Sequence, residues 1–200
     1  MLTTVLVHVP LVLLSALQLP QPTTDCRLDL LTPPFVESQA LAEFDARIQA
    51  YLTLHRRASR SIGPVGLMDD EGRFFAEELR TVIASARPQS RQGDFFTPRV
   101  GEAFKARIDA ALLAGIARPP ARLYEPLFGE PGPAVNGPFP LVLGSVHWPA
   151  LVNALPPLPA ELEYALWGRD LVLVDVPANL VLDVLIDALP EGARPEVSYQ

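Results

Sequence analysis

The sequence predicts an α+β fold that is mostly α-helical: a three-helix bundle, a proline-rich strap, and a C-terminal β-hairpin or small antiparallel sheet. Three observations lead to this prediction. Apolar residues recur every three or four positions over residues 36–115, which is typical of amphipathic helices. Between Gly115 and Ala160 lie 11 of the 22 prolines, which disfavour regular structure. After Pro159 apolar residues alternate, as they do in strands.

The first 22 residues are predicted to be a signal peptide or a short membrane anchor. The first charged residue is Asp25, and an apolar run from Thr4 to Leu17 precedes it. A secretory signal has an apolar core of this kind, whereas a spanning helix needs roughly 20 apolar residues. We therefore expect a periplasmic or secreted protein; the alternative is attachment to the inner membrane through uncleaved residues 2–19.

Residues 23–200 are predicted to form a single domain. This length is sufficient for one hydrophobic core, and the single cysteine, Cys26, excludes an internal disulfide. The helical part is expected over residues 36–115 and the strap over 116–160. Residues 161–189 are expected to contain a hairpin followed by a third strand or a helix.

The first helix is expected between Val36 and Arg57. It carries an apolar stripe at the spacing of one helix face. His55 lies on this stripe, where we interpret it as a half-buried core residue. The stripe consists of Leu41, Phe44, Ile48, Tyr51, Leu52 and His55.

The second helix is expected to begin at Asp69 or Asp70, with acidic residues in its first turn, and to end before Pro88. The acids Asp69, Asp70, Glu71, Glu77 and Glu78 could hold a hard cation, but the spacing of a calcium loop is missing. The residues predicted on the buried side of this helix are Phe74, Phe75, Leu79, Val82, Ile83 and Ala86.

The third helix has the clearest start signal. Thr97 is a good N-cap, and Pro98 supplies a backbone angle suited to the first helical position. Gly115 is a natural C-terminal stop. Phe95 and Phe96 are expected to pack back on this helix. Its predicted stripe is Val100, Phe104, Ile108, Ala111 and Leu112.

The strap over residues 116–160 is the predicted working surface, together with the acidic hairpin. It is rich in large apolar side chains, which a disordered linker would not carry. We therefore expect it to lie over the domain. The candidate binding residues in it are Tyr124, Phe128, Phe139, His147 and Trp148.

The hairpin is expected to turn at residues 168–170, between apolar runs over 162–166 and 171–174. The segment over residues 175–189 is a third strand or a helix. Its length favours a helix and its β-branched content favours a strand. A third strand would stabilise the hairpin, because two strands alone are marginal in water.

Three segments carry a resemblance to known proteins: Leu155–Tyr164, Gly168–Asp175 and Asn179–Val184. They resemble a short module of exported bacterial proteins of unknown function, and the whole chain resembles uncharacterised proteins of that kind. The last 35 to 40 residues, about a fifth of the chain, are similar to the C-terminal hairpin of the periplasmic nickel/cobalt-homeostasis family. The resemblance implies an envelope location. The His and Cys residues that metal binding requires are missing here, so no metal function is implied.

The sequence carries little of the chemistry that catalysis or metal binding needs. Metal sites gather His, Cys and carboxylates, but the chain has only His8, His55 and His147, without His-x-x-x-His or Cys-x-x-Cys. No metal or cofactor is therefore predicted. The nearest arrangement for hydrolysis is the pair Ser145 and His147, which falls short of the Gly-x-Ser-x-Gly motif.

The pattern as a whole favours a non-enzymatic interaction protein, or an accessory subunit of a larger complex, in the bacterial envelope. The partner is expected to be another envelope protein. Nucleic acid is disfavoured as a partner because the chain carries a net charge of -7. The alternatives are a small periplasmic hydrolase that uses Ser145 and His147, and a periplasmic carrier of a metal or small molecule.

Overall fold

The described part of the chain folds into four helices and a three-stranded antiparallel sheet, which confirms the predicted α+β class. Every described residue belongs to one compact unit, within Thr32–Gln200. Among the described residues, no helix is long and apolar enough to span a membrane. The computed structural model describes residues 34–63, 69–117, 132–140 and 148–191.

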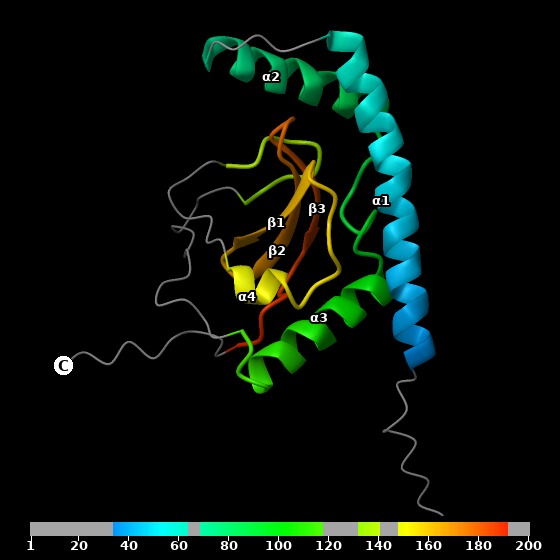
Figure 1. The fold of residues 1–200 in the computed structure, drawn as a ribbon, viewed down its shortest axis with the longest axis vertical. Helices are drawn as coiled ribbons and strands as arrows, with labels where there is room; N and C mark the ends of the chain where they lie inside the picture. Colours follow the sequence, from blue (N-terminus) through cyan, green and yellow to red (C-terminus); the bar gives the residue numbers. More distant parts are fainter. Residues whose placement is uncertain (1–33, 64–68, 118–131, 141–147, 192–200) are drawn as a thin grey trace, which may run out of the picture. The chain divides into compact units, whose positions relative to one another are not determined.

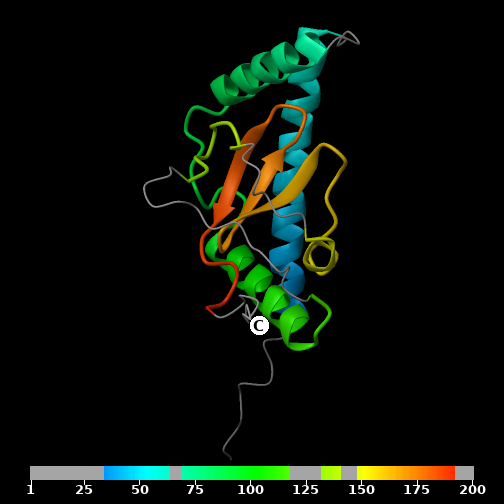
Figure 2. The ribbon, with the colours of Figure 1, turned by 90° about the vertical axis from the view of Figure 1, so that its left-hand side faces the viewer.

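The three longer helices are α1 (Pro34–Ile62), α2 (Asp69–Ala86) and α3 (Pro98–Leu113). α1 extends beyond the predicted residues 36–57 at both ends, whereas α2 begins at the predicted residue. Figure 1 shows α2 and α3 against opposite ends of α1, with the sheet between them and alongside α1. Figure 2 shows the same arrangement from the side. The helices therefore build their core together with the sheet.

The start and end of α3 are as predicted. Thr97 is the N-cap, and its hydroxyl accepts a hydrogen bond from the backbone N–H of Val100 at 3.5 Å. Gly115 has a φ of 67° just after the helix, a conformation that glycine adopts without strain. Phe96 packs edge-on against Phe104, with ring centroids 5.3 Å apart. The predicted contact of the residues before Thr97 with this helix is thereby confirmed.

The prediction for α2 is wrong at two of its six buried positions. Phe74 is 70 % exposed, and Ala86 is also exposed. The fully buried positions are Leu79 and Ile83, which are four residues apart and lie on one face. Phe75 lies four residues before Leu79 and is partly buried against the core. Phe74 is one residue earlier, about 100° further round the helix, so its side chain points away.

The sheet has the order β1-β2-β3, with β1 at Leu162–Trp167, β2 at Asp170–Asp175 and β3 at Leu180–Leu185. β1 and β2 form the predicted hairpin, which turns at Gly168 and Arg169. β3 pairs antiparallel with β2, so the segment whose structure was open between strand and helix is a strand.

The sheet is buried on both faces. On the helical face, Leu173 and Leu182 join the large core formed with α1, α2 and α3. On the other face, Val172, Val181 and Val184 form a second cluster. A strand that is buried on both sides appears in the sequence as a continuous apolar run. This explains why the alternation expected of a strand is weak over residues 180–185.

The described parts of the strap lie on the sheet and on its edge. The backbone N–H of Asn136 donates to the carbonyl oxygen of Val181 at 2.9 Å, and Val181 N–H donates to the Gly137 carbonyl at 2.9 Å. The strap therefore covers part of the outer edge of β3. Further along, the short helix α4 (Pro149–Val152) places Leu151 in the large core.

Candidate functional site

The candidate binding residues of the strap do not form one site in the described part of the chain. Phe139 is buried in the second cluster, with its ring centroid 6.5 Å from that of Trp167. Trp148 is buried in the large core, on the opposite face of the sheet. The remaining candidates lie outside the described residues: Tyr124, Phe128 and His147. Ser145 of the alternative hydrolase pair also lies outside them.

A groove lies between α1, α3 and the loop that follows α4. Its volume is about 370 Å³, which is near the lower end of the range for ligand pockets, roughly 300 to 1,000 Å³. Along α1 it extends from Leu41 to Ile48, about 10 Å at a rise of 1.5 Å per residue. It is lined by Leu41, Phe44, Asp45, Ile48, Arg107, Leu155, Pro156 and Pro157.

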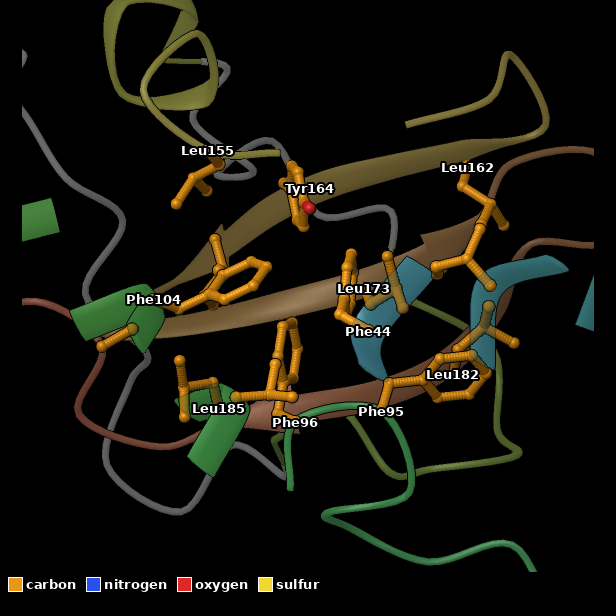
Figure 3. Packing of buried hydrophobic residues seen from close by; sticks show 14 of the residues in the cluster. Phe44, Phe95, Phe96, Phe104, Leu155, Leu162, Tyr164, Leu173, Leu182 and Leu185 are labelled. Atoms are coloured by element: carbon orange, nitrogen blue, oxygen red, sulfur yellow. The ribbon is translucent and has the colours of Figure 1, made fainter. Parts of the chain in front are cut away.

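The apolar walls of the groove are held by the core behind them. The Phe44 ring packs edge-on against Phe104 at 4.9 Å and stacks on Tyr164 at 6.5 Å. Figure 3 shows these rings gathered with Leu155 on the helical face of the sheet. The Tyr164 hydroxyl donates to the carbonyl oxygen of Pro156 at 3.1 Å. These contacts tie both walls to the sheet, so the groove is a preformed feature of the fold.

The two charged groups of the groove differ in their pairing. Arg107 Nε donates to Glu37 Oε1 at 2.6 Å, and Arg107 Nη1 lies 3.4 Å from the Ala154 carbonyl oxygen. Asp45 is exposed and accepts a hydrogen bond from the Gln49 amide at 3.3 Å. No basic side chain of the described residues forms an ion pair with Asp45. The groove thus has an apolar interior and one uncompensated carboxylate on its rim.

A buried polar cluster joins α1 to the end of β2. Asp175 is 0 % exposed, and its Oδ2 accepts a hydrogen bond from the Tyr51 hydroxyl. His55 Nδ1 lies 2.5 Å from the same oxygen. Since a carboxylate only accepts hydrogen bonds, Nδ1 is the protonated nitrogen of this contact. Asp175 Oδ1 accepts the backbone N–H of Ala178 at 2.9 Å.

An imidazole held by a carboxylate is the arrangement in which histidine acts as a general base on a nearby nucleophile. Among the described residues, no Ser, Thr or Cys side chain forms a hydrogen bond with His55. The Tyr51 hydroxyl is committed to Asp175, and burial followed by the negative charge of Asp175 raises the pKa of this tyrosine. A tyrosine that is held protonated is a poor nucleophile. The cluster therefore serves to attach α1 to β2 in the described fold.

Arg87 lies next to this cluster. Its guanidinium is 5.4 Å from the ring centroid of Tyr51 and 5.3 Å from that of Phe95, distances typical of cation–π contacts. Its Nη2 is 3.9 Å from Asp94 Oδ2. Burial lowers the pKa of Arg87. These contacts hold the segment after α2 against α1.

A second buried carboxylate, Asp183, holds that same segment to β3. Oδ1 accepts the backbone N–H groups of Gly93 at 2.9 Å and Val184 at 2.8 Å. Oδ2 accepts those of Phe95 and Phe96, both at 2.7 Å. All four hydrogen bonds come from the backbone. The role of this carboxylate is therefore to satisfy buried donors.

Sequence reasoning did not find the groove or the two carboxylate clusters. The stripe of the first helix predicts Tyr51 and His55 as core residues, and it gives neither of them a polar partner. The available signals were an Asp within each of two apolar runs, at Asp175 and Asp183, and the spacing of four residues between Tyr51 and His55. Buried Asp residues are normally paired, so each indicated a partner, but not which one.

No protein-family model, curated protein or solved structure matches this chain significantly. The resemblance to exported bacterial proteins stays a prediction. Among the described residues, no three His, Cys, Asp or Glu side chains gather closely enough to hold a metal ion. The groove is a described feature with room for a small ligand, and its geometry carries the functional argument.

Proposed function

We propose that this chain is an interaction protein or accessory subunit that receives a short apolar segment of a partner protein in the groove between α1, α3 and the residues after α4. The observation that carries the proposal is the groove itself, which has an apolar interior and walls fixed by Phe44 and Tyr164. Pockets of this kind gain binding free energy from apolar burial.

The size of the groove supports a short segment as the occupant. A length of about 10 Å along α1 matches about three residues of an extended chain at roughly 3.3 Å each. Burying one Leu or Phe side chain contributes about 1.5–3 kcal/mol. A stable protein–protein interface buries about 1,200–2,000 Å², which is more than a groove of this size provides. The groove therefore acts as an anchor, and contacts outside it complete the interface.

The proposed place of action is the bacterial envelope. This part of the proposal rests on the apolar run from Thr4 to Leu17, which precedes the first charged residue. The intact mass of the native protein from soluble and membrane fractions tests it. A soluble species without roughly the first 16 to 22 residues supports export. A full-length soluble cytoplasmic species contradicts it.

Photo-crosslinking in the native cell tests the interaction. A photoreactive amino acid replaces Pro157, which is exposed and lines the groove. The matched control carries it at Thr53, an exposed residue of α1 that does not line the groove. We expect one discrete adduct from position 157 and none from position 53, and loss of the adduct when Leu41→Arg is added. The same adducts from both positions, or none from position 157, would contradict the proposal.

A further inference from the structure

We infer that the segment bound in the groove is a cationic apolar peptide of a partner protein, in which Lys or Arg flanks one or two apolar side chains. This inference rests on the proposed function, because it names the kind of segment that the same groove takes. It rests on the two charged groups of the groove: Arg107 is paired with Glu37, whereas Asp45 forms no ion pair within the described residues.

Arg107 is the positive group of the groove, and its charge is already compensated. Its Nε lies 2.6 Å from Glu37 Oε1, a short charge-assisted hydrogen bond. Its Nη1 lies 3.4 Å from the Ala154 carbonyl oxygen. A carboxylate of a ligand would have to compete with Glu37 for this guanidinium. The groove therefore offers little to an anionic group.

Asp45 is the negative group, and within the described residues its hydrogen-bond donor is the neutral amide of Gln49, at 3.3 Å. It is exposed and lies on α1 between Phe44 and Ile48, which both line the groove. A cation on the ligand can therefore reach Asp45 while an adjacent apolar side chain is inside the groove. The long, flexible side chains of Lys and Arg suit this geometry.

The preference for a cation rests on Asp45 itself. The net charge of -7 does not add to it at the groove, because α1 and α3 together carry seven basic and five acidic residues, and charges farther away than about one Debye length, roughly 10 Å at 0.1 M salt, are largely screened. An apolar segment with acidic flanks fits the same interior but meets repulsion at the rim.

An array of pentapeptides tests the inference. Leu is held at the second and fourth positions, the other three positions are varied, and the array is probed with the purified full-length chain at low salt. An exposed ion pair contributes little, so we expect Lys or Arg to give about three- to tenfold more binding than Asp or Glu. The preference should weaken as salt is added.

Four variants make the test specific to the rim. Asp45→Asn should abolish the charge preference and keep binding to uncharged Leu peptides, and Asp45→Lys should reverse the preference. Asp109→Lys makes the same charge change at an exposed position of α3 outside the groove, and should keep the wild-type preference. Leu41→Arg should abolish binding of all peptides.

The outcomes separate this inference from the function on which it rests. Equal binding of basic and acidic peptides, lost in Leu41→Arg, overturns the inference and leaves the proposed function standing. Binding that survives in Leu41→Arg, or no binding at all, overturns both. Self-association of the chain that Leu41→Arg removes identifies a second copy as the occupant and also overturns the inference.

Discussion

Replacing Asp183 with Asn tests how much of the fold depends on one buried carboxylate. Its two oxygens accept four backbone N–H groups, two on each oxygen, from Gly93, Val184, Phe95 and Phe96. Asn has nearly the same shape but only one oxygen. Whichever way the amide turns, its NH₂ group faces two backbone N–H donors, and these two donors have no acceptor because NH₂ only donates.

The expected loss in free energy of unfolding follows from the number of backbone N–H donors that are left without an acceptor. Each buried donor left without an acceptor costs about 1–3 kcal/mol, so two cost about 2–6 kcal/mol. Domains of this size are stable by about 5–15 kcal/mol, so this loss is a large part of the total stability. A variant that is already unfolded without urea agrees with the upper end of the expected loss. Asp109→Asn, at an exposed position for which no hydrogen bond is found among the described residues, is the matched control.

The assay is equilibrium unfolding in urea at neutral pH, with the midpoint and slope measured for the wild type and both variants. We expect Asp109→Asn to lie within about 0.5 kcal/mol of the wild type. If Asp183→Asn is no less stable than Asp109→Asn, the four backbone contacts do not contribute as inferred, and the segment over residues 93–96 is held to β3 by apolar packing alone.

Three further predictions concern the other buried polar groups. Tyr51→Phe removes one donor from buried Asp175 and should lower the free energy of unfolding by about 1.5–3 kcal/mol; urea unfolding with an unchanged midpoint would contradict the role of this contact. Burial raises the pKa of Tyr51 and of Tyr164, so the folded state keeps these protons while the unfolded state loses them above pH 10 or so, and stability should fall as pH rises. In an ultraviolet titration of phenolate, two of the four tyrosines should ionise only as the protein unfolds, and smooth ionisation of all four in the folded state would oppose this. Burial also raises the pKa of Asp170 above its ordinary value of 3.8, so the folded state binds this proton first as pH falls. The gain in free energy of unfolding from Asp170→Asn should therefore be largest at neutral pH and should shrink as the pH falls toward 3.8. A gain that does not change with pH would contradict a raised pKa for Asp170.

Local signals in the sequence were sufficient for most of the elements. Thr97 and Pro98 mark the start of α3 because capping involves only neighbouring residues. The turn at Gly168 and the alternation on either side of it indicated the first hairpin. The strand at residues 180–185 could not be separated from a helix, because burial on both faces removes the alternation that distinguishes them.

The candidate site could not be predicted from local signals in the sequence. Leu41 and Ile48 come from α1, Arg107 from α3, and Pro157 from the loop after α4. Their proximity depends on how these elements pack on the sheet, and no local pattern encodes that. The same holds for Asp175, whose partners Tyr51 and His55 lie 124 and 120 residues away.

The sequence by itself determined where the helices and the first hairpin lie, that the chain is acidic, and that it has few His and Cys residues. These properties depend on composition and on contacts within a few residues. Only the tertiary structure decided that the last apolar run is a strand, that Phe74 faces away from the core, and that Asp45 is the uncompensated charge of a groove. The physical reason is that burial and charge pairing are properties of surfaces brought together from distant segments, and they exist only once the helices have packed on the sheet.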